Sequence, residues 1–154
     1  MLRHCVVIIS VVLPTYNHLK FLPQAIESIL SQTHTNFELI IVNDGSTDGT
    51  QAFLEKLDGF DPRIRIIHQS NHGLPHALNK GFSEAKGALF TWVSSDNYYA
   101  PIFLESFVSA FEKYPQNSFA ISAFAWIDEQ GHIQSIHNNQ PLQYRYFLHS
   151  CPGI

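Results

Sequence analysis

Charged residues are scarce in this sequence. They make up 14% of its 154 residues, against about 25% in an ordinary soluble domain. The net charge is -4 and the basic residues form no run, which argues against nucleic acid as a partner. A chain with so little charge is expected either to bury strands on both faces of a sheet or to lack a partner that covers part of it.

Cysteines are also few. Cys5 and Cys151 stand near opposite ends of the sequence, with the spacing of neither a metal site nor a disulfide framework. We therefore expect reduced thiols and a cytoplasmic location, with the cytoplasmic face of a membrane as the alternative in a longer parent protein. The most apolar stretch, residues 6–13, is shorter than the roughly 20 residues that span a bilayer and has no signal-peptide cleavage pattern after it.

Several well-known functional motifs are missing. No Gly-x-Gly-x-x-Gly follows the first apolar run, which disfavours a dinucleotide-binding oxidoreductase, and there is no phosphate-binding Walker loop. The Gly-x-Ser-x-Gly of common hydrolases is absent too. Three histidines are spaced four apart, but Gly73 and Pro75 interrupt the run, so we do not predict a metal site there. These three are His68, His72 and His76. We expect five further histidines to be surface residues: His18, His34, His132, His137 and His149.

Apolar runs alternate with segments of helical spacing. Four runs have the composition of strands, at 5–13, 37–42, 64–67 and 88–93. Apolar residues recur at helical intervals after each run, for example Leu22, Ala25, Ile26 and Ile29. This pattern predicts an α/β fold with a mostly parallel sheet and helices on both faces. We expect a single domain over residues 1–154.

The last third of the sequence predicts a hairpin. A fifth strand is expected at 119–127, and residues 129–132 can turn it back into 133–137. The aromatic stretch 143–148 has no following element to bury against. Such an exposed apolar tail can drive formation of a homodimer.

Polar residues gather where three of the predicted strands end. They are Pro14–Asn17 after the first strand, Asn43–Ser46 after the second and Ser94–Asn97 after the fourth. Ligands of open α/β sheets bind at the carboxyl ends of the strands. We therefore expect Asp44 and Asp96 to face one cleft.

The two aspartates have different expected roles. Asp44, followed by Gly45, can accept hydrogen bonds from a nucleobase or a ribose, or it can be a turn residue that caps the next helix. Asp96 can hold Mg²⁺ or Mn²⁺ if a diphosphate supplies the remaining oxygen ligands, or it can be an ordinary loop residue.

The turn after the first strand offers further ligand groups. Thr15 and Asn17 can hydrogen-bond a nucleobase or ribose, and Tyr16 can stack beside it. The alternative is a proline-containing turn with a buried tyrosine.

Several ordered motifs resemble the family 2 glycosyltransferases. The segment 11–17, Val-Val-Leu-Pro-Thr-Tyr-Asn, is similar to the family's opening strand and loop. The segment 38–48, which ends Asn-Asp-Gly-Ser-Thr-Asp, is the most specific. Asn71-His-Gly73 and then 92–97 continue the match in order, and the resemblance runs from about residue 9 to residue 135. It implies a GT-A fold in which Asp44 contacts the base.

Two positions depart from the family pattern. Ser94 or Ser95 stands where a first metal-binding aspartate is common, which leaves Asp96 as the acid of the motif. Leu78 occupies a place where many relatives have an arginine that could face the nucleotide.

The resemblance implies an inverting transfer of a hexosyl group from a nucleotide sugar, with a UDP-sugar as the expected donor. The acceptor would be a hydroxyl on a glycan or a lipid-linked molecule, in cell-wall or polysaccharide biosynthesis. We expect the chain to stop before the acceptor-binding half, with the catalytic base beyond Ile154. The predicted nucleotide-binding residues are Pro14, Thr15, Tyr16, Asn17, Asp44, Gly45, Ser46, Asn71, Ser95 and Asp96, with Asp96 also the predicted metal ligand.

Two other functions stay open at this point. One is a non-catalytic module that binds a nucleotide sugar. The other is an unrelated doubly wound protein, such as a receiver-like domain in which Asp44 accepts a phosphoryl group.

Overall fold

A computed structural model of the chain describes residues 7–116, 119–128 and 131–137. Its contacts divide the chain into two compact units, Met1–Glu112 and Lys113–Ile154. Each unit is described by itself below. The expectation of one domain over the whole chain stays a prediction.

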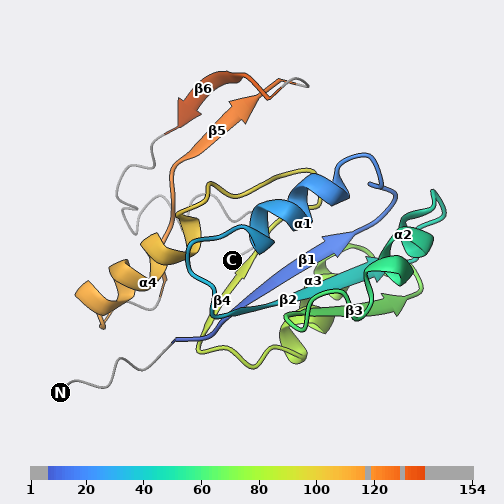
Figure 1. The fold of residues 1–154 in the computed structure, drawn as a ribbon, viewed down its shortest axis with the longest axis horizontal. Helices are drawn as coiled ribbons and strands as arrows, with labels where there is room; N and C mark the ends of the chain where they lie inside the picture. The colour runs from blue at the N-terminus through green and yellow to red at the C-terminus, as the bar shows by residue number, and fades with distance from the viewer. Residues whose placement is uncertain (1–6, 117–118, 129–130, 138–154) are drawn as a thin grey trace, which may run out of the picture. The chain divides into compact units, whose positions relative to one another are not determined.

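The first unit is built on a four-stranded parallel sheet in the order β3-β2-β1-β4. The strands are β1 (Ile9–Thr15), β2 (Phe37–Asp44), β3 (Ile64–Gln69) and β4 (Leu89–Trp92). The helices are α1 (Leu22–Leu30), α2 (Thr50–Leu57), α3 (Leu74–Ser83) and α4 (Phe103–Lys113). Figure 1 shows β1 between β2 and β4, so the first, second and fourth strands end side by side.

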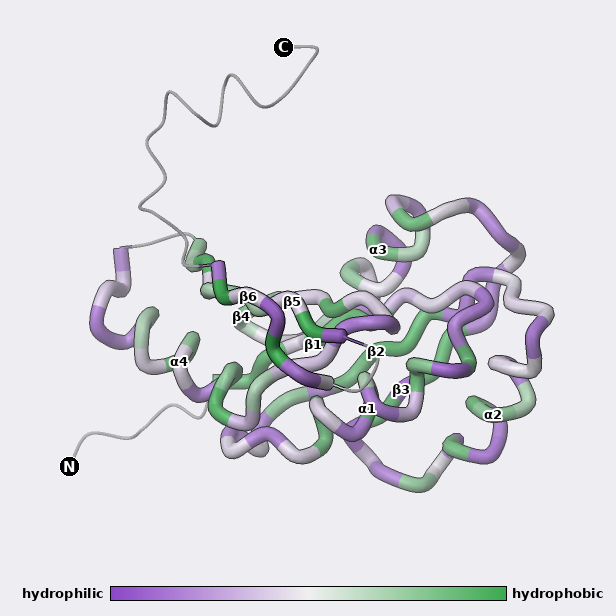
Figure 2. Tube along the Cα trace, turned by 90° about the horizontal axis from the view of Figure 1, so that it is seen from above, coloured by the Kyte–Doolittle hydropathy of each residue, from purple (hydrophilic) through white to green (hydrophobic). Residues whose placement is uncertain are grey.

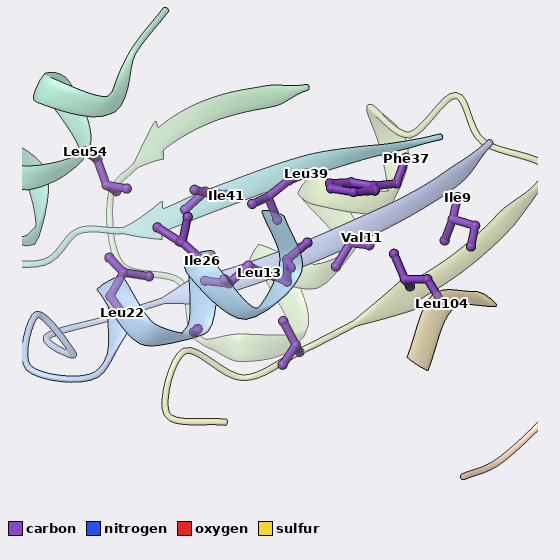
Figure 3. Close-up of a cluster of buried hydrophobic side chains, with 13 residues drawn as sticks. Ile9, Val11, Leu13, Leu22, Ile26, Phe37, Leu39, Ile41, Leu54 and Leu104 are labelled. Atoms are coloured by element: carbon purple, nitrogen blue, oxygen red, sulfur yellow. The ribbon is translucent and has the colours of Figure 1, made fainter. Parts of the chain in front are cut away.

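Helices cover both faces of this sheet, as the sequence predicts. Because side chains alternate along a strand, Val11 and Leu13 enter one core with α1, α2 and α4, while Val12 enters a second core with α3. Figure 2 shows α3 on one side of the strands and α1 and α2 on the other. Figure 3 shows Leu22 and Ile26 of α1 in one cluster with Leu13 and Ile41 of the strands.

Strand β1 differs from its predicted bounds of 5–13, because it continues through Pro14 to Thr15. A proline cannot donate to a sheet ladder and is usually excluded from central strands. Here the ladder with β4 ends at Val12, so Pro14 is paired with β2 alone. The proline therefore lies where the strand has a single neighbour.

Asp48, which directly precedes the N-cap residue Gly49, stabilises the start of α2. The carboxylate of Asp48 does accept from the backbone N–H and the hydroxyl of Thr50, at 3.1 and 2.6 Å. Gln51 stands three residues after Asp48, the spacing at which a glutamine can complete a capping box. Its amide instead donates to Glu55 at 2.9 Å, which is an exposed pair one helical turn along.

The second unit contains an antiparallel hairpin of β5 (Phe124–Ile127) and β6 (Ile133–His137). The hairpin is as predicted, but its first strand is shorter than the expected 119–127. The aromatic stretch 143–148 lies outside the described residues. Among the residues that are described, none of the helices is both long and apolar enough to cross a membrane.

Candidate functional site

The loops after β1 and β2 are tied together at the carboxyl edge of the sheet. The backbone N–H of Asn17 donates to Ser46 Oγ at 3.0 Å, and Asn17 Oδ1 accepts from the Thr47 N–H at 2.7 Å. Asn17 has a φ of 54°, in the left-handed region that asparagine tolerates better than most residues. One residue that we predicted as a nucleoside contact thus also joins two loops of the site.

The loop after β4 is joined to the same segment. His18 Nδ1 and Ser95 Oγ form a hydrogen bond of 2.8 Å, and Ser95 is buried. The next residue, Leu19, donates its backbone N–H to Asp48 at 3.0 Å. Three consecutive residues after β1 therefore contact the loops of both neighbouring strands.

Asp44 lies at the end of β2 and is 3% exposed. Its Oδ1 accepts from Gln69 Nε2 at 2.6 Å and from the His72 N–H at 3.0 Å. Its Oδ2 accepts from the Gly73 N–H at 2.8 Å. Those two N–H groups immediately precede α3. Asp44 therefore fixes the entry to α3, whereas the alternative reading of the sequence had it cap the helix that directly follows, α2.

The hydrogen bonds to Asp44 also set its charge. Burial by itself would raise the pKa of a carboxyl group, but the bonds from Gln69, His72 and Gly73 stabilise the anion and hold the pKa of Asp44 below its ordinary value. Asp44 is thus an ionised carboxylate at neutral pH.

Gly45 allows the backbone of Asn71, another predicted nucleotide-binding residue, to lie close to the turn after β2. A Cβ on Gly45 would lie 2.7 Å from the backbone nitrogen of Asn71, and the φ of Gly45 is 75°. Glycine is the residue that satisfies both the positive φ and the close approach. Asn71, which is 27 residues further along the chain than Asp44, is exposed directly beside this turn.

Among the described residues, Thr15 at the end of β1 has the one buried side-chain oxygen or nitrogen that lacks a hydrogen-bond partner. Its Oγ1 is buried and has no hydrogen-bond partner. Such a group costs about 1–3 kcal/mol when it stays unsatisfied. Its neighbours on either side differ in exposure, because Pro14 is buried and Tyr16 is 47% exposed. The tyrosine is therefore not the buried turn residue that one reading of the sequence allowed.

Asp96 is exposed in a short turn after β4, which the Asn97 N–H closes by donating to the Ser94 carbonyl at 3.0 Å. Three or more His, Cys, Asp or Glu side chains gather nowhere in the described part of the chain in a way that could hold a metal. A single carboxylate is enough for Mg²⁺ or Mn²⁺ where phosphate oxygens and water complete the shell. A cation at Asp96 would therefore have to take its remaining ligands from a bound diphosphate and from water.

Leu78 shows what the departure from the family pattern does. It is partly buried against the core formed by Val12, Ile40, Val42 and Ala77. An apolar side chain at this position adds to the packing of α3. Leu78 itself offers no charge to a nucleotide.

Sequence reasoning missed three polar residues that organise the site. His18 was expected to be a surface residue, and that was wrong, because it is half-buried and bonded to Ser95. Gln69 holds Asp44. The buried Gln32 donates to the Ala100 carbonyl at 2.8 Å and accepts from the Leu104 N–H at 3.0 Å. The position of His18 directly after Pro-Thr-Tyr-Asn was the available signal; Gln32 and Gln69 act across chain separations that no local pattern reveals.

The spaced histidines do not converge on one point. His68 Nδ1 in β3 lies 3.1 Å from Nδ2 of Asn43, its cross-strand partner in β2. His72 and His76 have ring centroids 4.7 Å apart, and His76 Nδ1 lies 3.2 Å from Gln69 Nε2. The last two rings therefore belong to the surroundings of Asp44.

Two solved structures share this fold. The structure of S. aureus TarS in complex with UDP-GlcNAc matches 70% of this chain and 32% of its own, with a TM-score of 0.63 and 28% identity. A mannosyltransferase of Pyrobaculum calidifontis, in complex with GDP-Man and Mn²⁺, matches 79% of this chain and 35% of its own, with a TM-score of 0.60 and 20% identity. The first unit thus has the GT-A architecture of these enzymes.

Sequence comparison points the same way. An uncharacterized glycosyltransferase of Rickettsia felis is 35% identical over 125 residues, which are 80% of this chain and 21% of the relative. This chain thus spans about a fifth of the length of that protein. The model of glycosyl transferase family 2 matches residues 10–152. Together with the fold, this match shows that the chain belongs to glycosyl transferase family 2.

Proposed function

We propose that this chain is the donor-binding part of a glycosyltransferase that moves a hexosyl group from a UDP-sugar to a hydroxyl of a glycan or a lipid-linked acceptor. The observation that carries the proposal is the joining of the loops after β1, β2 and β4 into one polar edge around an ionised Asp44. The similarity to TarS, which was solved with UDP-GlcNAc, supports a UDP-sugar as the donor.

The base and ribose would be recognised at the loops after β1 and β2. Oδ1 of Asp44 accepts two hydrogen bonds and Oδ2 accepts one, so Oδ2 keeps acceptor capacity for a base N–H. The orphaned Oγ1 of Thr15 would gain a partner from the nucleoside or a water that accompanies it. The exposed ring of Tyr16 would stack on the base. Five further residues complete the proposed nucleotide site: Pro14, Asn17, Gly45, Ser46 and Asn71.

The diphosphate would lie toward the loop after β4, beside Ser95 and Asp96. We propose that Asp96 holds Mg²⁺ or Mn²⁺ there, with phosphate oxygens and water as the other ligands. The cation would neutralise charge on the leaving diphosphate. In this proposal the chain contributes the Asp96 carboxylate, on a turn whose flanking residues Ser95 and Tyr99 are hydrogen-bonded to His18 and Ser28.

No base for the acceptor hydroxyl is assigned among the described residues. The carboxylate of Asp128 accepts from the His132 N–H at 2.8 Å and from Gln134 Nε2 at 2.9 Å. The first contact lies in the turn between β5 and β6, and the second comes from β6. We therefore assign Asp128 to the hairpin turn.

A non-catalytic module that binds a nucleotide sugar is the second candidate. The observation in its favour is that Asp96 is the single acid of the β4 turn. Replacement of Asp96 by alanine separates the two functions. Under the first it removes the metal-dependent part of UDP binding, and under the second it changes UDP binding little.

Calorimetric titration of the chain with UDP, with Mn²⁺ or with EDTA, tests the proposal. We expect binding that Mn²⁺ strengthens, and loss of that gain in Asp96→Ala. The matched control is Glu55→Ala, because Glu55 is an equally exposed carboxylate on α2, away from these loops. An absence of heat at millimolar UDP, with a folded protein by circular dichroism, contradicts nucleotide binding.

The proposal includes a cytoplasmic location and formation of a homodimer. The first rests on the spacing of the two cysteines, which fits no disulfide framework. The second rests on the aromatic composition of residues 143–148.

A further inference from the structure

The segment Asn17–Leu19 connects two parts of the proposed site. Asn17 and Leu19 contact the loop after β2, at Ser46, Thr47 and Asp48. His18, between them, points the other way along the sheet edge and contacts Ser95 in the loop after β4. Of the three residues, His18 is therefore the one whose side chain contacts the turn that carries Asp96.

The turn that carries Asp96 is held at both ends. On one side Ser95 is 2% exposed and bonded to His18. On the other side the Tyr99 N–H donates to Ser28 Oγ at 3.1 Å. Residues 96–98 between these points are exposed. The backbone that carries Asp96 is thus held on both sides, while its side chain is exposed.

The backbone and the ring of His18 have separate contacts. Its carbonyl oxygen accepts from the N–H groups of Phe21 and Leu22, at 3.0 Å each, where the chain enters α1. Its ring meets Ser95 and lies edge-on to Phe21, with centroids 6.3 Å apart. A change of the side chain therefore removes the link to Ser95 and leaves the start of α1 in place.

We propose that His18 is a positioning residue that, through Ser95, holds the Asp96 turn against the nucleoside-binding loop, so that the base and the metal-bound diphosphate are recognised as one ligand. This inference rests on the proposed function, because it assigns His18 to the same nucleotide site. His18 does not itself touch the nucleotide in this scheme. Its effect appears in the part of UDP affinity that depends on the cation.

Three variants and one control test the inference. His18→Leu removes the hydrogen bond to Ser95. His18→Asn is the conservative variant, because an asparagine amide places a polar atom close to where Nδ1 of histidine lies. Ser95→Ala removes the same bond from the other side. Ser83→Ala is the control, because Ser83 loses only a hydroxyl bond to Lys80 within α3.

Two readouts are needed. The first is the affinity for UDP, measured with Mn²⁺ and with EDTA. The second is hydrogen exchange of the Asn97 amide in the protein without nucleotide, since that N–H closes the Asp96 turn. A merely structural loss would weaken UDP binding equally in Mn²⁺ and in EDTA.

We expect His18→Leu and Ser95→Ala to lower UDP affinity in Mn²⁺ by about three- to tenfold, the range of one hydrogen bond. In EDTA we expect UDP affinity to change by less than about twofold, which is smaller than the effect of losing one hydrogen bond. Asn97 exchanges faster in both variants, and His18→Asn restores most of the affinity. A further variant that combines His18→Leu with Ser95→Ala adds nothing to either single one. The Ser83→Ala control matches the wild type.

Two results would overturn the inference while the proposed function stands. One is a His18→Leu protein that keeps the full gain from Mn²⁺ and the wild-type exchange of Asn97. The other is an equal loss of affinity in Mn²⁺ and EDTA. Failure of the wild type to bind UDP overturns the proposed function instead, and the assignment of His18 to a nucleotide site with it.

Discussion

The two ends of the parallel sheet are polar for different reasons. At the amino end the polar groups satisfy one another: Glu38 accepts from Ser10 Oγ and the Lys86 N–H, at 2.6 and 2.5 Å, and lies 3.5 Å from Arg65. Glu84 is paired with Lys80 and Arg65. At the carboxyl end the contacts tie loops to one another and leave other groups unmatched.

The unmatched groups are what set the carboxyl end apart. Thr15 Oγ1 is buried there without a partner, and Tyr16, Asn71 and Asp96 are exposed beside it. A polar network that is complete within the chain serves the fold, whereas one with vacant acceptors and exposed groups around it is suited to a ligand. Substitutions at the two ends should therefore separate stability from nucleotide binding.

The largest effect is expected for Asp44→Asn. An amide in place of the carboxylate turns N–H groups toward the donors of Gln69, His72 or Gly73. We expect a loss of about 1–3 kcal/mol in the free energy of unfolding and at least about tenfold in UDP affinity. Urea unfolding and UDP titration measure the two. Asp58→Asn, at an exposed carboxylate beyond α2, is the control, and equal behaviour of the two variants would contradict this account of Asp44.

Glu38→Gln tests the amino end. The change disturbs the contacts with Ser10, Lys86 and Arg65, so we expect a loss of about 1–2 kcal/mol in the free energy of unfolding. UDP affinity should stay at the wild-type value, since no contact of Glu38 reaches the loops of the site. A fall in UDP affinity under conditions where the variant is fully folded would remove the distinction between the two ends.

Acid should weaken both ends. Burial opposes the effect, but the hydrogen bonds to Glu38 and Asp44 hold the pKa of each below its ordinary value, 4.5 and 3.8 respectively. A carboxyl with a lowered folded pKa adds stability that is full above its unfolded pKa and is lost as the pH falls through the folded one. Urea midpoints below about pH 4.5 should therefore fall less steeply in Glu38→Gln and Asp44→Asn than in the wild type. If the urea midpoints of all three proteins fell with pH at the same rate, the lowered pKa values of Glu38 and Asp44 would be contradicted.

The smallest effect on stability is expected for Thr15→Val, which removes the orphaned hydroxyl and keeps the shape of the side chain. The free energy of unfolding should stay constant or rise by up to about 1 kcal/mol. UDP affinity should fall by about threefold, the lower range for one hydrogen bond. A destabilised protein with unchanged UDP affinity would mean that Thr15 Oγ1 serves the fold.

Much of the fold could be predicted from the sequence because its signals are local. The β-branched runs and the helical spacing of Leu22, Ala25 and Ile26 place strands and helices on both faces of the sheet. The end of β1 was predicted two residues short, because Pro14 ends most strands and the single neighbour of β1 at that point is a property of the assembled sheet.

The location of the site could be predicted from the sequence, but most of the hydrogen bonds within it could not. The polar residues after β1, β2 and β4 do lie side by side, because the connection from β3 to β4 places β4 next to β1, on the side opposite β2. The partners of Asp44 could not be predicted, because Gln69, His72 and Gly73 come from a strand end and a helix start 25 to 29 residues away. The bond between His18 and Ser95 spans 77 residues and carries no local signal.

The central claim is that the loops after β1, β2 and β4 form one site for a nucleoside diphosphate. Amide chemical shifts of the ¹⁵N-labelled chain, titrated with UDP and Mg²⁺, test it directly. The account predicts that Tyr16, Gly45, Gly73 and Asp96 shift together along one saturation curve. Shifts confined to the groove between α1 and α2, at Ile26, Phe53 and Leu57, or separate saturation of Gly45 and Asp96, would contradict it.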